Sequence, residues 1–490
     1  MRATGPAPAA THDWAMVLRS TARYVAAILC AASLAVATAL PEAVARHLDD
    51  FVLGRMQVWD TPGLSLVVVH GDEPSLSRGY GFADREAGRP MTEETLVVLG
   101  STTKALTALA VMQLVEAGLI ELDAAVTRYL PWFSTPGGHQ DQITVRHLMS
   151  HSSGYPWGIL FTGRRYPAEL EDYVRWLRRV RLEAPPGARF GYSNDTFVIL
   201  GLVIERVTGT PYEHYMHANV LEPLRMTHTT FDIELARARG LARGYRYVDG
   251  RAEPLDIRFF PSERPAGKLM TNAVELEHYF RMLLGGGRFE GHRIVSEHAL
   301  QQMWTPVVIA DASGLEYGLA WYLDTVAGLQ LLSHPGSVRN SGSRFVLVPG
   351  ASLAVGVLSN VSRPLDPRHE VAESIAAAAL LFGEAPLEAP KTVILTPTRA
   401  DDALLRAVPG VYASAAGALI VTARDGVLVG SLQGHDFELE PAGGSTFLVR
   451  STFERLDGLE LEFQGAELSG AAAAGDRLAL MGLWFAFRVE

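Results

Sequence analysis

The chain is poor in cysteine and in lysine, and both shortages limit the chemistry that it can perform. Cys30 is the only cysteine among 490 residues, so intramolecular disulfides are excluded, as are zinc sites built from several thiolates. Only three lysines are present, Lys104, Lys268 and Lys391, and arginine supplies the other basic residues. Because arginine stays protonated at any usable pH, a lysine at a reactive position can serve as a base where arginine cannot.

Two further absences exclude whole classes of protein. The formal net charge is −11 and the sequence has no run of basic residues, which argues against nucleic acid as a partner. No Gly-x-Ser-x-Gly segment occurs, so the nucleophile elbow of α/β-hydrolases is missing. A chain of this length, 48% hydrophobic, is expected to fold into two or three domains with full cores.

Residues 1–39 have the pattern of a secretory signal peptide. Arg19 and Arg23 precede an uncharged apolar run at 24–40, and the small-x-small segment 37–39 has the form of a cleavage site. We therefore predict a secreted or periplasmic protein. The apolar run is short for a membrane span, but an uncleaved signal would instead anchor the protein to a membrane.

The start of this segment and its cysteine leave two further questions. The residues before Met16 resemble neither a signal nor a folded segment, so Met16 is an alternative start to Met1. Cys30 lies inside the apolar run, behind the poor lipidation motif 27–29, so we do not expect lipidation. Removal of the signal would leave no cysteine, which excludes a cysteine nucleophile from the mature protein.

Residues 40–384 are predicted to form a mixed α/β (α+β) domain around one antiparallel sheet. Helical periodicity and β-branched runs indicate helices at 41–58, 101–117, 143–149, 167–181, 197–207, 272–284 and 367–382, and strands at 64–69, 77–82, 317–321, 329–334, 343–348 and 352–359. Strands occur near both ends of this region and helices between them. We therefore expect both ends to contribute to one sheet, flanked by helices and accompanied by a helical subdomain.

The last hundred residues have a different pattern. Residues 385–397 are rich in proline and read as a linker. Residues 398–490 contain only short strand-like segments and hairpin turns, which predicts a small all-β domain, either a barrel or a sandwich. This domain has no recognisable chemistry. We interpret it as a stabilising module, and the alternative is a lid or substrate filter over a cleft.

The most informative motif is Ser101-Thr102-Thr103-Lys104, which opens an apolar helix. A serine and a lysine three residues apart lie on one helical face, so the hydroxyl and the amine can meet. The start of a helix also offers free backbone N–H groups and a positive dipole end, both of which stabilise an oxyanion. By itself the motif is weak, because a capping serine followed by a solvated lysine has the same spacing.

Two later segments add polar groups of the right kind. Tyr192 and Asn194 stand on a turn before the apolar helix 197–207, where both can point into one cleft. The alternative is a tyrosine ring packed in the core and an asparagine that caps the helix. His334 ends the predicted strand 329–334, and Pro335-Gly336 follows at once.

Taken together, these segments resemble the serine β-lactamases and penicillin-recognising D-peptidases, especially the class C enzymes and their esterase and D-aminopeptidase relatives. The motifs occur in the family's order: Ser101-Thr102-Thr103-Lys104, Tyr192-Ser193-Asn194 and His334-Pro335-Gly336. Residues 79–84, 147–154 and 317–321 are also similar to that family. The resemblance covers residues 41–383 and implies a β-lactamase-like fold.

The resemblance also implies a serine hydrolase that works through an acyl-enzyme and needs neither a metal nor another cofactor. Ser101 would attack the acyl carbon, Lys104 would act as its base and Tyr192 would be the second proton carrier. Asn194 would hold the substrate amide and position the lysine. The backbone N–H groups of Ser101 and Ser337 would form the oxyanion hole. The expected partner is a small-molecule or peptide substrate.

The third motif departs from the family pattern. With Gly336, His334 is assigned to substrate binding, but it replaces a lysine that is common in β-lactamases. A neutral histidine is a weaker anchor for a substrate carboxylate. Pro335 replaces a hydroxyl residue, and because it lacks an N–H it suits only an edge strand. These changes favour esters, amides or D-peptides as substrates over efficient hydrolysis of β-lactams.

Other interpretations compete with this one. The main alternative is a non-catalytic relative that binds a peptide or a cell-wall fragment through the same cleft. His147 and His151 are four residues apart, but no glutamate-flanked zinc motif surrounds them, so we interpret them as structural rather than as metal ligands. The arginine-rich segment 167–181 is interpreted as a surface helix, with a substrate lid as the alternative.

Overall fold

The computed structural model describes most of the chain after the predicted signal. The described residues are 40–157, 167–248, 250–256, 259–311, 314–326, 328–362, 367–383, 408–415, 417–424, 427–432, 435–443, 446–451, 460–464, 477–480 and 483–488. The predicted signal peptide (1–39) and linker (385–397) lie outside them.

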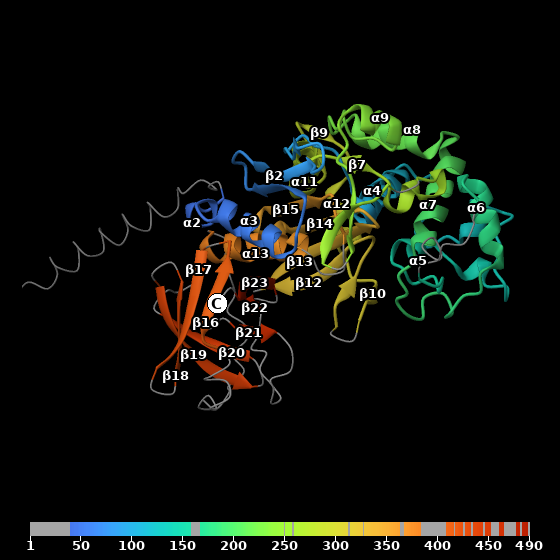
Figure 1. Cartoon of the computed structure of the whole chain (residues 1–490). Helices are drawn as coiled ribbons and strands as arrows, with labels where there is room; N and C mark the ends of the chain where they lie inside the picture. The colour runs from blue at the N-terminus through green and yellow to red at the C-terminus, as the bar shows by residue number, and fades with distance from the viewer. Residues whose placement is uncertain are drawn as a thin grey trace, which may run out of the picture.

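A nine-stranded antiparallel sheet forms the centre of the larger domain (Figure 1). Its strand order is β10-β11-β12-β13-β14-β15-β1-β2-β3. The strands are β1 Gly63–His70, β2 Leu76–Asp84, β3 Arg89–Pro90, β10 Val308–Ile309, β11 Glu316–Tyr317, β12 Tyr322–Val326, β13 Leu329–Val338, β14 Ser341–Val348 and β15 Leu353–Ser359. β1 pairs with β15, with Leu64 opposite Ser359. The expectation that both ends of the domain build one antiparallel sheet is therefore confirmed.

Both faces of this sheet are covered, and the alternation along β1 shows how. Val67 and Val69 join one hydrophobic cluster, with helices from the middle of the chain, including α11 (Ala273–Leu284). Leu66 and Val68 join a second cluster, with α2 (Glu42–Ala45), α3 (Leu48–Val58) and α13 (Pro367–Phe382). Because successive side chains point to opposite faces, a strand buried on both faces reads as a continuous apolar run, as this one does.

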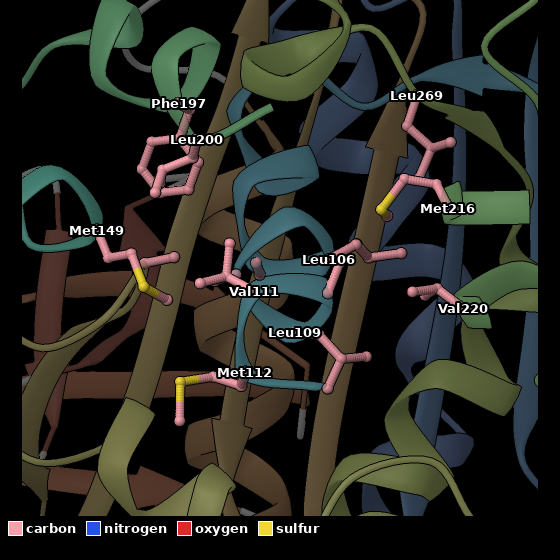
Figure 2. Close-up of a cluster of buried hydrophobic side chains, with 14 of the residues drawn as sticks. Leu106, Leu109, Val111, Met112, Met149, Phe197, Leu200, Met216, Val220 and Leu269 are labelled. Carbon is pink, nitrogen blue, oxygen red and sulfur yellow. The ribbon is translucent and has the colours of Figure 1, made fainter. Parts of the chain in front are cut away.

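The helical subdomain surrounds α4 (Thr103–Glu116), which follows the 3₁₀ turn η1 (Gly100–Thr102). The remaining helices of this part are α5 Val145–Met149, α6 Leu170–Trp176, α7 Asn194–Thr208, α8 Tyr212–Met216, α9 Ile233–Ala238, α10 Arg264–Gly267 and α12 Glu297–Met303. Figure 2 shows side chains of α4 packed against residues of several neighbouring segments, among them Met149, Phe197 and Leu269. A helix that is apolar all round is expected at such a central position.

Three predicted elements differ from the observed ones. The helix at 41–58 is divided into α2 and α3, and two aspartates in the first turn of α3 favour a new helix start. The helix at 167–181 is limited to α6 and a 3₁₀ turn at Leu177–Arg179. Residues 317–321 form no continuous strand, because Ala320 has φ of +68° and its N–H donates to the Met149 carbonyl at a helix end.

Beyond the linker, eight strands form a closed barrel (Figure 1). They are β16 Gly410–Ser414, β17 Gly417–Arg424, β18 Val427–Leu432, β19 His435–Gly443, β20 Thr446–Ser451, β21 Glu460–Gln464, β22 Arg477–Leu480 and β23 Leu483–Arg488. The prediction of a separate all-β region is confirmed, in its barrel form. None of the described helices is long and apolar enough to cross a bilayer.

The barrel packs on α13, the helix that covers one face of the large sheet. Tyr412 and Leu419 of the barrel share a hydrophobic cluster with Val371 and Ile375 of α13. The backbone N–H of Ala415 donates to the Ser374 hydroxyl over 3.0 Å. Nearly every residue of α13 is buried, so the helix has no face suited to solvent. The barrel is therefore part of the packing of the larger domain.

We predict that a chain ending at Gly383 is less stable than the full chain. Removing the barrel exposes apolar side chains of α13, and each such side chain loses about 1.5–3 kcal/mol of burial free energy. The free energy of unfolding, measured by urea denaturation, should fall by more than about 2 kcal/mol. Ser374→Ala is the control that keeps the barrel, and losing the hydrogen bond from the Ala415 N–H should cost about 1 kcal/mol. An unchanged unfolding midpoint in the truncated chain would contradict this packing role.

Candidate active site

Ser101 lies in η1, and the backbone of η1 closely approaches strand β13. Gly100 has φ of +67°, and a Cβ there would lie 2.5 Å from the backbone N of Ser337. Only glycine allows both the left-handed conformation and this contact. The sequence Gly-Ser-Thr-Thr-Lys therefore brings the Ser101 backbone beside Ser337, on the strand that carries the third motif.

Lys104 is completely buried and contacts three oxygen atoms. Its Nζ lies 3.0 Å from Ser101 Oγ, 2.6 Å from Asn194 Oδ1 and 2.7 Å from the Ala266 carbonyl. Burial holds the pKa of Lys104 well below its usual value, although the nearby Asp195 acts in the opposite direction. A neutral amine has two N–H donors and one lone pair. It can donate to Asn194 and Ala266 and accept from the Ser101 hydroxyl.

Asn194 is the first residue of α7, and its side chain does not cap that helix. Ser193 is the N-cap residue, and its side chain makes no capping hydrogen bond either. The alternative of a capping asparagine is therefore wrong: its Oδ1 accepts from Lys104 instead. The next residue, Asp195, accepts from Tyr173 Oη over 2.6 Å, and burial raises the pKa of Asp195 to about 6.

Tyr192 lies against Lys104 and His151. The Lys104 Nζ is 5.1 Å from the tyrosine ring centroid, and the His151 ring centroid is 4.1 Å away. The Tyr192 hydroxyl is shielded from solvent and makes no regular hydrogen bond within the described part of the chain. Burial raises the pKa of Tyr192 above its usual range, while the Ser101 hydroxyl acts to lower it. The ring is thus packed in the core while the hydroxyl lies near the nucleophile.

His334 is fully buried and both of its ring nitrogens have partners. Its Nδ1 is 2.7 Å from the Pro335 carbonyl and its Nε2 is 3.1 Å from Tyr317 Oη. Burial, followed by the influence of Lys104, lowers the pKa of His334 to about 3. A neutral ring that donates from Nδ1 and accepts at Nε2 fits this arrangement. The ring therefore carries no positive charge.

A solvent-open pocket lies directly over Ser101. Its walls are formed by Ser101, Asn194, Glu263, Ala266, Gly267, Lys268, Ser337 and Val338. Of the seven predicted site residues, the structure brings Ser101, Asn194 and Ser337 to this pocket. Lys104 lies directly behind Ser101, whereas Tyr192, His334 and Gly336 are not among the wall residues.

Sequence reasoning missed the Glu263 and Lys268 side of this pocket. The two residues flank the short helix α10, and no periodic pattern in the sequence predicts that helix. The one available signal was the scarcity of lysine, since Lys268 is one of only three.

Among the residues that the structure describes, the third motif lies on a strand with a single neighbouring strand at that point. β12 pairs with residues 329–333 of β13, while residues 334–338 pair with β14 alone. The expectation that Pro335 suits an edge is met locally, although β13 as a whole is an interior strand. A Cβ on Gly336 would overlap the Leu99 carbonyl, so glycine is required where β13 passes the segment before Ser101.

Arg368, at the start of α13, forms hydrogen bonds with this strand. Its buried guanidinium donates to the Gly336 carbonyl, to the Ser343 carbonyl over 3.4 Å and to the Ser337 hydroxyl over 3.3 Å. A Cβ on Gly342 would overlap the guanidinium, so that glycine provides the space that the arginine occupies. Arg368 thus fixes the backbone beside Ser101.

The two histidines at 147 and 151 have separate surroundings. His147 completes the N-terminal capping box of α5 with Thr144, and its Nδ1 lies 3.1 Å from the Gln142 carbonyl. His151 is buried, with its Nδ1 3.3 Å from the backbone N of Ser193. Within the residues that the structure describes, no three His, Cys, Asp or Glu side chains are grouped so that they could hold a metal ion.

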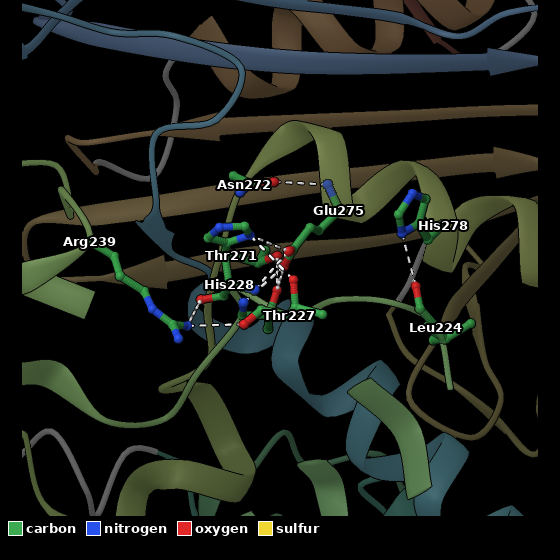
Figure 3. Close-up of polar contacts among 9 residues, drawn as sticks. Leu224, Thr227, His228, Arg239, Thr271, Asn272, Glu275 and His278 are labelled. Carbon is green, nitrogen blue, oxygen red and sulfur yellow. Dashed lines mark hydrogen bonds and ion pairs between the residues drawn. The ribbon is translucent and has the colours of Figure 1, made fainter. Parts of the chain in front are cut away.

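A second polar cluster, shown in Figure 3, is connected through strand β7 to the segment that precedes Ser101. The buried Glu275 carboxylate accepts from the backbone N–H groups of His228 and Thr229 and from the Thr229 hydroxyl. Thr229 also bonds Thr271 of β7 (Met270–Thr271), which pairs with β4 (Val97–Val98) just before η1. An open pocket adjoins this cluster, but its buried carboxylate is already satisfied by protein donors.

Comparisons with known proteins show which family this chain is similar to. A family model described as Beta-lactamase matches residues 48–380. The chain is 26% identical over 328 residues to "Protein flp" of Staphylococcus aureus (strain COL), which covers 66% of this chain and 64% of that protein. It is 28% identical over 322 residues to "Unguisins hydrolase ungD'" of Aspergillus campestris (strain IBT 28561), covering 62% of this chain and 59% of that protein. The chain thus spans less than two thirds of both relatives.

A solved structure is similar over more of the chain. It is the octameric penicillin-binding protein homologue from Pyrococcus abyssi, with a TM-score of 0.62 and 26% identity. The match covers 89% of this chain and 98% of that protein. This is more than residues 48–380 contain, so the likeness extends into the C-terminal β region.

We predict that Arg368→Met destabilises the fold. The substitution leaves the Gly336 and Ser343 carbonyls without their buried donor, and each lost partner of this kind costs about 1–3 kcal/mol. Urea unfolding should show a loss of about 3 kcal/mol. Arg368→Lys should recover only part of it, because an ammonium cannot reproduce the planar fork of donors. Equal stability of the two variants would show that the guanidinium geometry is unimportant.

Proposed function

Because the chain belongs to the β-lactamase family, we propose that it is a serine hydrolase that forms an acyl-enzyme at Ser101. The observation that carries the proposal is the 3.0 Å contact between Ser101 Oγ and the fully buried Lys104 Nζ. A lysine kept neutral by burial is a competent base for a serine hydroxyl. This matches what the motif resemblance implied.

In the proposed mechanism the neutral Lys104 accepts the Ser101 proton as Oγ attacks the acyl carbon. Negative charge develops on the carbonyl oxygen, which the backbone N–H groups of Ser101 and Ser337 would stabilise. Tyr192 would carry that proton to the leaving group, whose bond to the acyl carbon then breaks. In the second half, water attacks the ester on Ser101, the bond between the acyl carbon and Oγ breaks, and a proton from that water passes to the serine oxygen, which releases the acid.

The proposed substrates are esters, amides or D-peptides rather than β-lactams. His334 is neutral and occupied by Tyr317 and the Pro335 carbonyl, so it offers no cation to a carboxylate. Pro335 supplies neither a hydroxyl nor an N–H. One of the relatives is named as a hydrolase, which favours catalysis over the alternative of a non-catalytic binding protein. We propose a secreted or periplasmic location on the basis of residues 1–39 alone.

Covalent labelling tests this function. A fluorophosphonate probe should add one adduct to the intact wild-type protein, because an activated serine attacks phosphorus as it attacks an acyl carbon. Ser101→Ala should gain none, as measured by intact-protein mass. Ser337→Ala is the matched control, since it removes a neighbouring hydroxyl but keeps the backbone N–H. An unlabelled wild type would favour the binding-protein alternative.

The pH profile tests Lys104 as the base. The base must be neutral, so kcat/KM should fall as the pH drops through the Lys104 pKa. The Asp195 charge raises that pKa, so Asp195→Asn should move the acid limb of the profile to lower pH.

Glu171→Gln is the control for this shift, because it removes an exposed carboxylate that pairs with Arg175. Its profile should match that of the wild type. An acid limb that stays in place in Asp195→Asn would argue against Lys104 as the group that titrates.

A further inference from the structure

The pocket over Ser101 has an ion pair in its wall. Lys268 directly follows α10 and is 7% exposed, and its Nζ lies 3.1 Å from Glu263 Oε2. The ammonium also lies 4.7 Å from the Phe259 ring centroid. Glu263 and Lys268 line the same pocket as Ser101 and Asn194. The ion pair therefore lies beside the nucleophile, in the wall of the same pocket.

Stability alone does not explain a buried pair at this position. Burying two charges costs desolvation free energy that their attraction often fails to offset, and a well-packed apolar pair of similar size is commonly as stable. An ammonium has three N–H donors. Glu263 forms an ion pair with the ammonium and the Phe259 ring faces the cation, so N–H donor capacity remains for a group that enters the pocket.

Among the residues that line this pocket, Lys268 is the cation. Lys104 is driven toward its neutral form by burial and His334 is uncharged, so neither supplies a charge to a substrate. Asn194 and Ser337 are neutral. The nearby negative charge of Glu263 offsets the long-range field of the Lys268 charge. The main contribution of Lys268 to substrate binding is therefore a short-range, directional hydrogen bond.

We propose that Lys268 is a specificity-determining residue that binds an oxygen acceptor of the substrate, a carboxylate or an amide carbonyl, close to the bond that Ser101 cleaves. This inference rests on the proposed function and names a substrate class for it. Esters and amides that carry such an acceptor are the preferred acyl donors, and plain alkyl esters are poor ones.

The test compares matched substrates in wild type and Lys268→Met. One series has a common 4-nitrophenol leaving group and acyl parts derived from butyric acid, N-acetylglycine and glutaric acid. These provide no acceptor, a carbonyl and a carboxylate. A second series places the same groups on the leaving side, as butyrate esters of 3-methylphenol, 3-carbamoylphenol and 3-carboxyphenol. Rates are corrected for spontaneous hydrolysis.

In at least one series, Lys268→Met should lower kcat/KM for the acceptor-bearing ester by about tenfold or more, the usual result of losing a hydrogen bond from a charged donor. The ester without an acceptor should change by less than about threefold. A loss confined to the carboxylate identifies a charged group, and a loss shared by the carbonyl identifies an amide. If both series keep their wild-type selectivity, the proposal is wrong.

Two controls separate this result from other failures. Glu263→Gln combined with Lys268→Met removes both charges, so no buried carboxylate is left unpaired, and it should show the same selectivity loss. Arg128→Met removes an exposed cation paired with Glu121 and should leave selectivity unchanged. All variants are first labelled with the fluorophosphonate. A wild type without an adduct at Ser101 overturns the proposed function itself, whereas labelled variants with unchanged selectivity overturn only the role of Lys268.

Discussion

The burial of Lys104 is the constraint on which the candidate site depends. Burying a charged lysine is costly, so a lysine side chain with no exposure is driven toward its neutral form. Here Asn194 Oδ1 and the Ala266 carbonyl accept hydrogen bonds from Lys104 Nζ, and Ser101 Oγ makes the third polar contact of that atom. Three elements must meet at one atom for this to work: α4, the start of α7 and α10. The central position of α4 in the hydrophobic core (Figure 2) is what makes such a dry meeting point available.

Glycines permit the second set of close approaches. Gly100 lets η1 touch the backbone of Ser337, Gly336 lets β13 pass the Leu99 carbonyl, and Gly342 leaves room for the Arg368 guanidinium. Side chains at these three positions would push the nucleophile, the strand and the supporting arginine apart. The geometry of the site therefore depends on these three glycines as well as on its polar side chains.

The barrel changes how the larger domain should be understood. α13 lies between the sheet and the barrel, and its residue Arg368 contacts Gly336 and Ser337 beside the pocket. One helix therefore links the C-terminal domain to the strand that borders the nucleophile. This places the barrel in the packing of the domain, and it agrees with a solved relative that matches the chain beyond residue 380.

The sequence by itself determined most of the elements and the order of the motifs. A β-branched run identified strand β1, and the apolar run after Lys104 identified helix α4. The Ser101-to-Lys104 spacing placed two groups on one helical turn, because neighbours within four residues are fixed by helix geometry. Only the tertiary structure decided the rest. It showed that Lys268 and Glu263 line the pocket and that His334 faces Tyr317, since such pairs depend on how distant segments pack. Local sequence carries little information about contacts of that range, which the shared core sets instead.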